Sequence, residues 1–303
     1  MLYKEWLNEW LELYIKTSTK CRTYGKYRRQ IEMYILPMLG EYEINELTAI
    51  VLQKFSVTLK EKCLAANTVN GIISVLKSSL KKAVVLGIAD RQFSDCIVRP
   101  KKSEKRVVCF GKDEQKKIER YIFEKRQPKL FGIILCLYTG LRIGELLALT
   151  WDEIDFRQGL LTVIKSCRDS WVNGRYIKVI DTPKTQNSER IIPIPRQILG
   201  YLKELKRQTH CPFVVVGRTE QGAQVRSYQR TFEILLKKLG VPHRGFHALR
   251  HTFATRALEV GMDVKTLSEI LGHKNPMITL QRYAHSLLEH KTEMMNKVGR
   301  LLL

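Results

Sequence analysis

Apolar side chains recur every three or four residues through much of the first hundred positions. Between residues 3 and 16, tryptophan, leucine and tyrosine fall at helical spacing, and glutamates fill many of the remaining positions. This pattern predicts amphipathic helices that each bury one face. The predicted helices span residues 3–16, 23–37, 47–62 and 67–84. Residues 1–98 are therefore expected to fold as a small helical domain.

The next stretch, residues 99–106, is rich in charge and shows no periodicity. It is the best linker candidate. It is either a plain solvated loop or a segment that crosses a phosphate backbone.

Residues 107–303 mix helical spacing with short β-branched runs. Helices are predicted over 113–125, 130–149, 246–259, 264–271, 276–284 and from 227 onward, and strands over 160–165, 176–180 and 190–194. Asn173-Gly174 is typical of a hairpin turn and is assigned between the first two strands. The expected fold class is mainly α with a small antiparallel sheet, an α+β arrangement.

The charge balance narrows the class of partner. Lysine and arginine number 52 against 30 acidic residues, which gives a formal net charge of +22. The basic residues are spread along the chain, as expected of folded surfaces that bind a nucleic acid. A well-solvated basic protein of the ribosome is the alternative that charge alone leaves open. A membrane partner is not expected, because no apolar run approaches the roughly 20 residues that cross a bilayer.

Two groups of basic residues are candidates for contact with a nucleic acid. Lys77 and Lys81, together with Lys82, are spaced to share one flank of a predicted helix. The other group lies in the charged stretch after residue 98. The DNA-binding candidates are Lys77, Lys81, Lys101, Lys102 and Arg106.

The cysteines and the N-terminus indicate a compartment. Seven cysteines are scattered, and no two form a Cys-x-x-Cys pair, which is typical of reduced thiols. The first residues, Met1-Leu-Tyr-Lys-Glu-Trp, lack the apolar core of a signal peptide. A cytoplasmic protein is expected.

An arginine near a helix start is the first candidate for phosphate chemistry. Arg142 lies in the apolar segment Thr-Gly-Leu-Arg-Ile-Gly-Glu, and Glu145 follows one turn later. Its guanidinium fork suits two phosphate oxygens, and Glu145 could hold it in place. A purely structural pair of Arg142 and Glu145 accounts for the same residues.

Two short motifs near the C-terminus carry histidine and arginine. His247 and Arg250 are three residues apart on a predicted helix and share a face, whereas His251 is expected to point elsewhere. His273 lies in the connection between two predicted helices, and Tyr283 follows ten residues later. A histidine could accept the proton of a tyrosine while an arginine binds the phosphate that the tyrosine attacks. Each motif alone also fits an ordinary structural position.

Lys184 lies in the turn between the second and third predicted strands. A turn lysine is normally just solvated, but this one could donate a proton to a leaving alkoxide. Lys178 competes for that role from within a strand.

Taken in order, these motifs resemble the phage integrase family of tyrosine recombinases. The matching segments are Thr-Gly-Leu-Arg142-x-x-Glu-Leu, the turn lysine Lys184, His247-x-Leu-Arg250-His-Thr, Leu-Gly-His273 and Arg-Tyr283. The N-terminal region is similar to the helical, SAM-like core-binding domain of that family, so the resemblance covers almost the whole chain. Integrases of phages and conjugative transposons are the members that it resembles most.

The resemblance implies a covalent mechanism. Tyr283 would attack a phosphodiester, leaving a 3′-phosphotyrosyl bond and a free 5′-hydroxyl. His247 would assist deprotonation of the tyrosine, and Lys184 would protonate the leaving oxygen.

In the same mechanism, Arg142 and Arg250 would stabilise the charge of the transition state, with a hydrogen bond from His273. Glu145 would support Arg142. The energy of the broken bond is kept in the intermediate, so no cofactor, neither ATP nor a metal, is implied.

The resemblance also implies an assembly. Two domains would close around duplex DNA, and a homotetramer would act at core and crossover sites in a bacterial, nucleoid-associated setting. The amphipathic segment 286–303 either docks on its own domain or, as the family suggests, exchanges with a neighbouring protomer. An excisionase or a host DNA-bending factor would be a further partner. The chain begins directly at the core-binding domain, either because the protein is of a simpler kind or because an arm-binding domain has been removed.

Two other classes remain open. A type IB topoisomerase-like enzyme would make the same cut without exchanging partners, and a DNA-binding regulator would keep the fold without the chemistry. The presence of all six candidate residues argues against a regulator. The core-binding region and the tail favour a recombinase over a topoisomerase, and a metal-dependent nuclease is disfavoured because no carboxylate cluster lies near the motifs.

Overall fold

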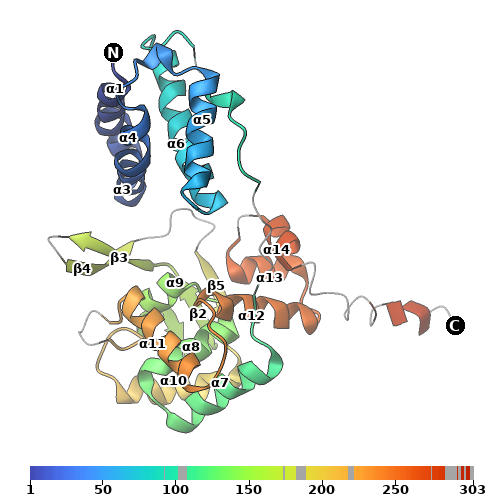
Figure 1. Cartoon of the computed structure of the whole chain (residues 1–303). Helices are drawn as coiled ribbons and strands as arrows, with labels where there is room; N and C mark the ends of the chain where they lie inside the picture. The colour runs from blue at the N-terminus through green and yellow to red at the C-terminus, as the bar shows by residue number, and fades with distance from the viewer. Residues whose placement is uncertain are drawn as a thin grey trace. The chain divides into compact units, whose positions relative to one another are not determined.

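The computed structural model describes most of the chain. It covers residues 1–91, 93–101, 108–172, 175–181, 189–217, 222–273, 275–283, 292, 295–296 and 298–300, without the side chains of 171, 172, 175 and 281–283. The chain divides into two compact units, Met1–Lys105 and Arg106–Leu303, which we call the N-terminal unit and the C-terminal unit (Figure 1). The expected linker, 99–106, and the expected exchange helix, 286–303, lie largely outside the described residues.

The N-terminal unit contains helices and no strand within its described length. Its elements are α1 (Tyr3–Glu9), the π-helical η1 (Trp10–Ile15), α2 (Lys16–Ser18), α3 (Cys21–Gln30), the π-helical η2 (Ile31–Ile35), α4 (Leu36–Leu39), the 3₁₀ turn η3 (Ile44–Glu46), α5 (Ala49–Glu61), α6 (Ala66–Val85) and the 3₁₀ turn η4 (Ser94–Cys96). The four helices predicted from the apolar spacing are present, and π-helical turns run through the first two.

Aromatic side chains at the start of the chain fix the core of this unit. Tyr3, Trp6 and Trp10 are buried, as the helical spacing requires. The hydroxyl of Tyr3 lies 2.6 Å from Oγ of Ser79, and Nε1 of Trp6 donates to the carbonyl of the same serine at 3.1 Å. Both polar groups are thus satisfied while buried, and α1 is tied to α6.

The C-terminal unit combines helices with two small antiparallel sheets (Figure 1). Its helices are α7 (Lys112–Lys125), α8 (Pro128–Thr139), α9 (Ile143–Ala148), the 3₁₀ turn η5 (Trp151–Glu153), α10 (Arg196–Gln208), α11 (Val225–Lys238), α12 (His247–Glu259), α13 (Val264–Leu271) and α14 (Pro276–Tyr283). One sheet has the order β1 (Ile154–Asp155), β2 (Leu160–Val163), β5 (Arg190–Pro193), and the other pairs β3 (Ser166–Val172) with β4 (Arg175–Asp181). The predicted fold class, mainly helical with a small antiparallel sheet, is confirmed.

Three details of this unit differ from the prediction. The helix expected over 130–149 is two helices, because Gly140 takes φ +66° and ends α8. The strand β3 was not predicted, and β4 pairs with β3 rather than with β2. The hairpin was therefore assigned between the wrong strands. Asn173 and Gly174 themselves lie outside the described residues. The helix α10 was also not predicted.

The core of this unit surrounds α8, which packs against α12. From Leu130 to its end at Thr139, every residue of α8 except Tyr138 is buried. Such a helix is apolar on all sides. The strand β5 contacts α13, and β3 contacts α9. These contacts bring four segments together that are far apart in the sequence: the end of α8, the start of α9, β5 and the end of α13.

Candidate active site

Arg142 lies directly before α9 and is held by Glu145. The backbone N–H of Arg142 donates to Oε2 of Glu145 at 2.9 Å, and its Nη1 donates to Oε1 at 2.7 Å. Its Nη2 donates to the carbonyl of Gly272 at 3.0 Å. The side chain is 37% exposed, so part of the guanidinium faces solvent while the rest is fixed. The contact between Arg142 and Glu145 is the one that their spacing predicts.

Arg250 is buried, at 2% exposure. Its Nη1 donates to the carbonyl of Gly140 at 2.8 Å, and its Nη2 donates to the carbonyl of Leu271 at 2.6 Å. The same Nη2 lies 3.0 Å from Nε2 of His273. A buried guanidinium requires such acceptors, and these come from the ends of two helices, α8 and α13.

His273 is oriented on both sides of its ring. Its Nδ1 lies 2.7 Å from the hydroxyl of Thr279, on α14. Because a guanidinium cannot accept a hydrogen bond, Nε2 accepts from Arg250, and a neutral ring then carries its proton on Nδ1 and donates it to Thr279. The ring thus links Arg250 to the helix that ends at Tyr283.

Arg190 was missed in the sequence and belongs to the same cluster. It is the first residue of β5, and its side chain is 6% exposed. Its Nη2 and Nη1 donate to the two carboxylate oxygens of Glu145 at 2.7 and 3.2 Å, and its Nε donates to the carbonyl of Ile270 at 2.6 Å. A signal was available, since strand alternation places Arg190 on the same face as the buried Ile192.

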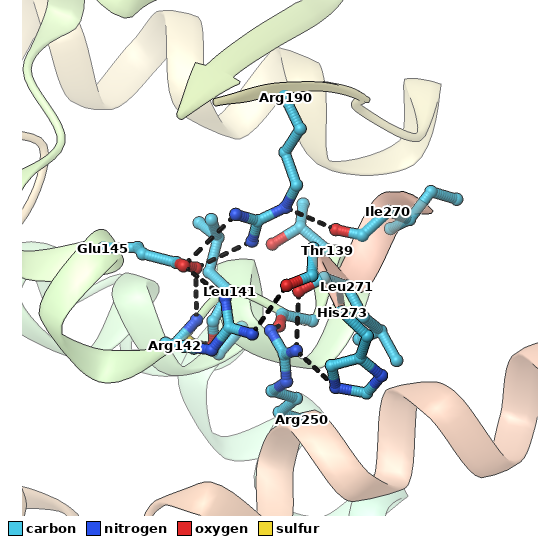
Figure 2. A network of polar contacts seen from close by, with 12 residues as sticks. Thr139, Leu141, Arg142, Glu145, Arg190, Arg250, Ile270, Leu271 and His273 are labelled. Carbon is cyan, nitrogen blue, oxygen red and sulfur yellow. Dashed lines mark hydrogen bonds and ion pairs between the residues drawn. The ribbon is translucent and has the colours of Figure 1, made fainter. Parts of the chain in front are cut away.

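Figure 2 shows the guanidinium groups of Arg142, Arg190 and Arg250 gathered beside the end of α13. We call these three residues the arginine cluster. Burial alone would raise the pKa of the Glu145 carboxyl, but Arg190 and then Arg142 more than offset it and lower that pKa from 4.5 to about 2. Glu145 is therefore ionised at neutral pH.

His247 is the first residue of α12 and is exposed. Its ring lies edge-on against that of His251, with centroids 4.5 Å apart and planes at 82°. The expectation that His251 points elsewhere is wrong, because residues four apart on a helix lie on one face.

Three further candidates differ in how far the structure describes them. Lys184 lies outside the described residues. The backbone of Tyr283 ends α14, and its side chain is not described. The rival Lys178 is half-buried in β4 with Nζ 3.8 Å from the ring centre of Phe213, and burial lowers its pKa.

The DNA-binding candidates of the N-terminal unit are only partly grouped as expected. Lys77 and Lys81 line one hollow of about 330 Å³ with Arg99, and Lys77 forms an ion pair with Asp95. Lys82, expected on the same flank, instead lies over the ring of Tyr14, 4.7 Å from its centre. Of the remaining candidates, Lys101 is exposed, and Lys102 and Arg106 lie outside the described residues.

The described residues offer neither a metal site nor a membrane span. No group of three or more histidine, cysteine, aspartate or glutamate side chains within them is placed to hold a metal ion. No helix in the same part of the chain has the length and apolarity of a membrane-spanning segment.

Known proteins resemble this chain over nearly its full length. Residues 112–290 match the phage integrase family, and residues 2–59 match the N-terminal SAM-like domain of phage integrases. The chain is 31% identical to a XerC-like tyrosine recombinase from Caldanaerobacter subterraneus subsp. tengcongensis, over 98% of this chain and 82% of the relative. It is 25% identical to the transposase of transposon Tn916 from Enterococcus faecalis, over 97% of this chain and 80% of the relative.

A solved structure agrees with the fold. The Tn1549 transposon integrase, in complex with a circular intermediate DNA, has a TM-score of 0.81 at 23% identity and covers 98% of this chain and 99% of its own. The chain therefore belongs to the phage integrase family of tyrosine recombinases. It is a tyrosine-type site-specific recombinase, an enzyme that transfers DNA strands. The predicted family, enzyme class and SAM-like N-terminal domain are confirmed.

Proposed function

We propose that this chain integrates and excises a mobile genetic element by cutting and rejoining duplex DNA through Tyr283. The observation that carries the proposal is the arginine cluster at the end of α13, bonded to His273 and one short connection before α14, the helix that ends at Tyr283. Phosphoryl transfer requires positively charged hydrogen-bond donors that are fixed around one point.

The proposed step is a transesterification. The phenolic oxygen of Tyr283 forms a bond to the scissile phosphorus, and the bond from phosphorus to the 5′-oxygen breaks. His247 accepts the proton of the tyrosine, and Lys184 gives a proton to the leaving 5′-oxygen. One phosphodiester replaces another, so the second transfer can reseal the strand without an outside energy source.

The arginines act on the same phosphate. Arg142 is partly exposed and can turn unused N–H groups to a non-bridging oxygen, and Arg250 faces the same point from α12. A phosphate oxygen that takes the Nη2–H of Arg250 would release Nε2 of His273. That nitrogen then needs a proton before it can donate to the phosphate.

Duplex DNA and further copies of the chain are the proposed partners. The net charge of +22 and the DNA-bound integrase of the same fold support the duplex, and the Tn916 transposase supports a mobile element. Exchange between two duplexes cuts four strands, and each chain supplies one Tyr283, so four protomers are needed. The N-terminal unit would bind the core site through Lys77 and Lys81. An excisionase or a DNA-bending factor would set the direction of recombination.

A covalent capture tests the nucleophile even though the target sequence is not defined. The parent protein is incubated with nicked duplexes of random sequence, and DNA that stays attached in denaturing detergent is recovered and sequenced. We expect the parent and a Tyr42→Phe control, changed at an exposed tyrosine of the N-terminal unit, to capture one family of sites. Tyr283→Phe should capture none, and equal capture by this variant would remove Tyr283 from the mechanism.

The recovered site also tests strand exchange itself. We expect exchange between two duplexes that carry the site. Relaxation of a supercoiled plasmid without exchange, or binding of DNA without any captured adduct, would contradict the proposed integration and excision.

A further inference from the structure

The end of α13 presents three consecutive carbonyls, and each accepts from a different arginine. Arg190 donates to Ile270, Arg250 to Leu271 and Arg142 to Gly272. The last carbonyls of a helix have no partner within it and form the negative end of its dipole. The arginine cluster satisfies these orphan acceptors and fixes the turn that carries His273.

The turn itself has little freedom. Gly272 takes φ +64°, and the N–H groups of Gly272 and His273 donate back to the carbonyls of Glu269 and Ser268 at 3.0 Å each, which is a Schellman motif. A Cβ on Gly272 would lie 3.0 Å from Nη1 of Arg190. Arg190 therefore packs directly against the turn.

Arg190 also determines the net charge of the group formed by Glu145 and its two arginine partners, Arg142 and Arg190. Glu145 paired with Arg142 alone would make a neutral couple, which would stabilise a phosphate poorly. Arg190 forms a bidentate pair with the same carboxylate, so the three groups together carry one net positive charge. This net positive charge is available to a phosphate at Arg142, because Arg142 is partly exposed and Arg190 is almost wholly buried.

We propose that Arg190 is a positioning residue for strand cleavage: it neutralises Glu145 and holds the end of α13, so that Arg142 keeps its charge and its aim for the scissile phosphate. The proposal rests on the proposed function. Its Nη1 and Nη2 donate to Glu145 and its Nε donates to the Ile270 carbonyl, so Arg190 acts through these partners and does not itself contact DNA.

Single-turnover cleavage of the captured duplex, at saturating protein, tests this role. Arg190→Met should slow cleavage about 100-fold, as the loss of one preorganised charge does elsewhere, while the dissociation constant for DNA stays within about threefold because phosphate affinity comes mainly from exposed lysines and arginines. Arg190→Lys, which keeps the charge without the fork, should be intermediate and covers the case in which the methionine variant does not fold.

A double variant separates the electrostatic role from a merely structural one. In Arg190→Met with Glu145→Gln, the glutamine still accepts from the backbone N–H of Arg142 but no longer cancels its charge. We expect this double variant to cleave at least about tenfold faster than Arg190→Met alone, since coupled neighbours deviate from additivity.

Arg256→Met is the matched control. Arg256 also holds a carboxylate with two hydrogen bonds, to Glu259 at 2.8 and 2.7 Å, and also donates to a backbone carbonyl, that of Phe110, at 3.0 Å. This variant should cleave at the parent rate.

Parent-like cleavage by Arg190→Met, or a double variant as slow as the single one, would overturn the proposal while the parent remained active. A parent protein with no Tyr283-dependent adduct would overturn the proposed function as well.

Discussion

Two groups of basic residues, one in each unit, hold their positive charge in opposite ways. In the N-terminal unit the core is apolar, and Lys77 and Lys81 lie at the surface, one of them paired with Asp95. In the C-terminal unit Arg190 and Arg250 are buried, with carbonyls as hydrogen-bond partners. Exposed charges are mobile and screened by salt, whereas buried charges have fixed geometry and are screened far less.

This difference suggests a division of labour. Surface lysines contribute affinity for DNA, through the release of counterions, without fixing the position of any atom. Preorganised guanidiniums contribute to the rate, because they need no rearrangement when charge develops. We therefore expect changes in the arginine cluster to act on cleavage and changes at Lys77 or Lys81 to act on binding.

The largest effect is expected at Arg250. Arg250→Lys keeps the charge, but one ammonium cannot reach Gly140, Leu271 and His273 as the fork does. Cleavage of the captured duplex at saturating protein should fall about 10²–10³-fold. The dissociation constant, measured by fluorescence anisotropy, should change little.

The control for Arg250→Lys lies on the same helix. Arg256→Lys, six residues along α12, should leave the rate unchanged. Weaker DNA binding by Arg250→Lys, with a normal rate once bound, would contradict the division of labour.

Gly272 offers a way to sharpen the comparison without removing any charge. Gly272→Ala adds backbone strain at φ +64° and places a Cβ 3.0 Å from Nη1 of Arg190. Gly261, at φ +90° after α12, has nothing within 4 Å of the same Cβ. Both alanine variants should lose on the order of 1 kcal/mol of stability by urea denaturation. Only Gly272→Ala should also cleave more slowly, by about tenfold, and equal cleavage by the two variants would show that the turn tolerates displacement.

The regular elements near the site could be predicted because local rules determine them. The predicted range of α13, 264–271, matches the structure because its apolar spacing ends at a glycine that takes a positive φ. The break between α8 and α9 was missed, since a helix that is buried on every side has no amphipathic period to show where it ends.

The arginine cluster could be predicted only in part. The contact between Arg142 and Glu145 spans three residues and follows from helix geometry. Arg190 reaches Glu145 across 45 residues and Ile270 across 80, and no local pattern encodes such a partner. Its place opposite α9 and α13 depends on how β5 packs.

A pH series compares buried and exposed carboxylates. Arg190 and Arg142 lower the pKa of buried Glu145 to about 2, so the stability that its charged form contributes is complete above about pH 4.5 and is lost as the pH falls toward 2. Between pH 5 and 3, urea denaturation of the parent should therefore lose stability more steeply than that of Glu145→Gln, by up to about 1.4 kcal/mol per pH unit.

The exposed counterpart in the N-terminal unit is Glu12. A hydrogen bond from Lys16 lowers its pKa, and Glu12→Gln should flatten the curve only at low salt. If high salt reduced the pH dependence contributed by Glu145 as much as that contributed by Glu12, salt would screen the buried carboxylate as strongly as the exposed one.

The smallest effect is expected from the surface lysines. Lys81→Gln should weaken DNA binding a few-fold and lower the slope of log affinity against log salt by about 0.9, the value for one lost phosphate contact. Asp95→Asn should tighten binding, because it frees Lys77 from its ion pair. Lys4→Gln, at a lysine paired with Glu41, is the control and should change neither. In all three variants cleavage at saturating protein should match the parent, because none of these side chains holds a reacting atom in place. A slower rate in Lys81→Gln would mean that the N-terminal unit positions the DNA as well as binding it. Both units would then position the DNA for cleavage, and not the arginine cluster of the C-terminal unit alone.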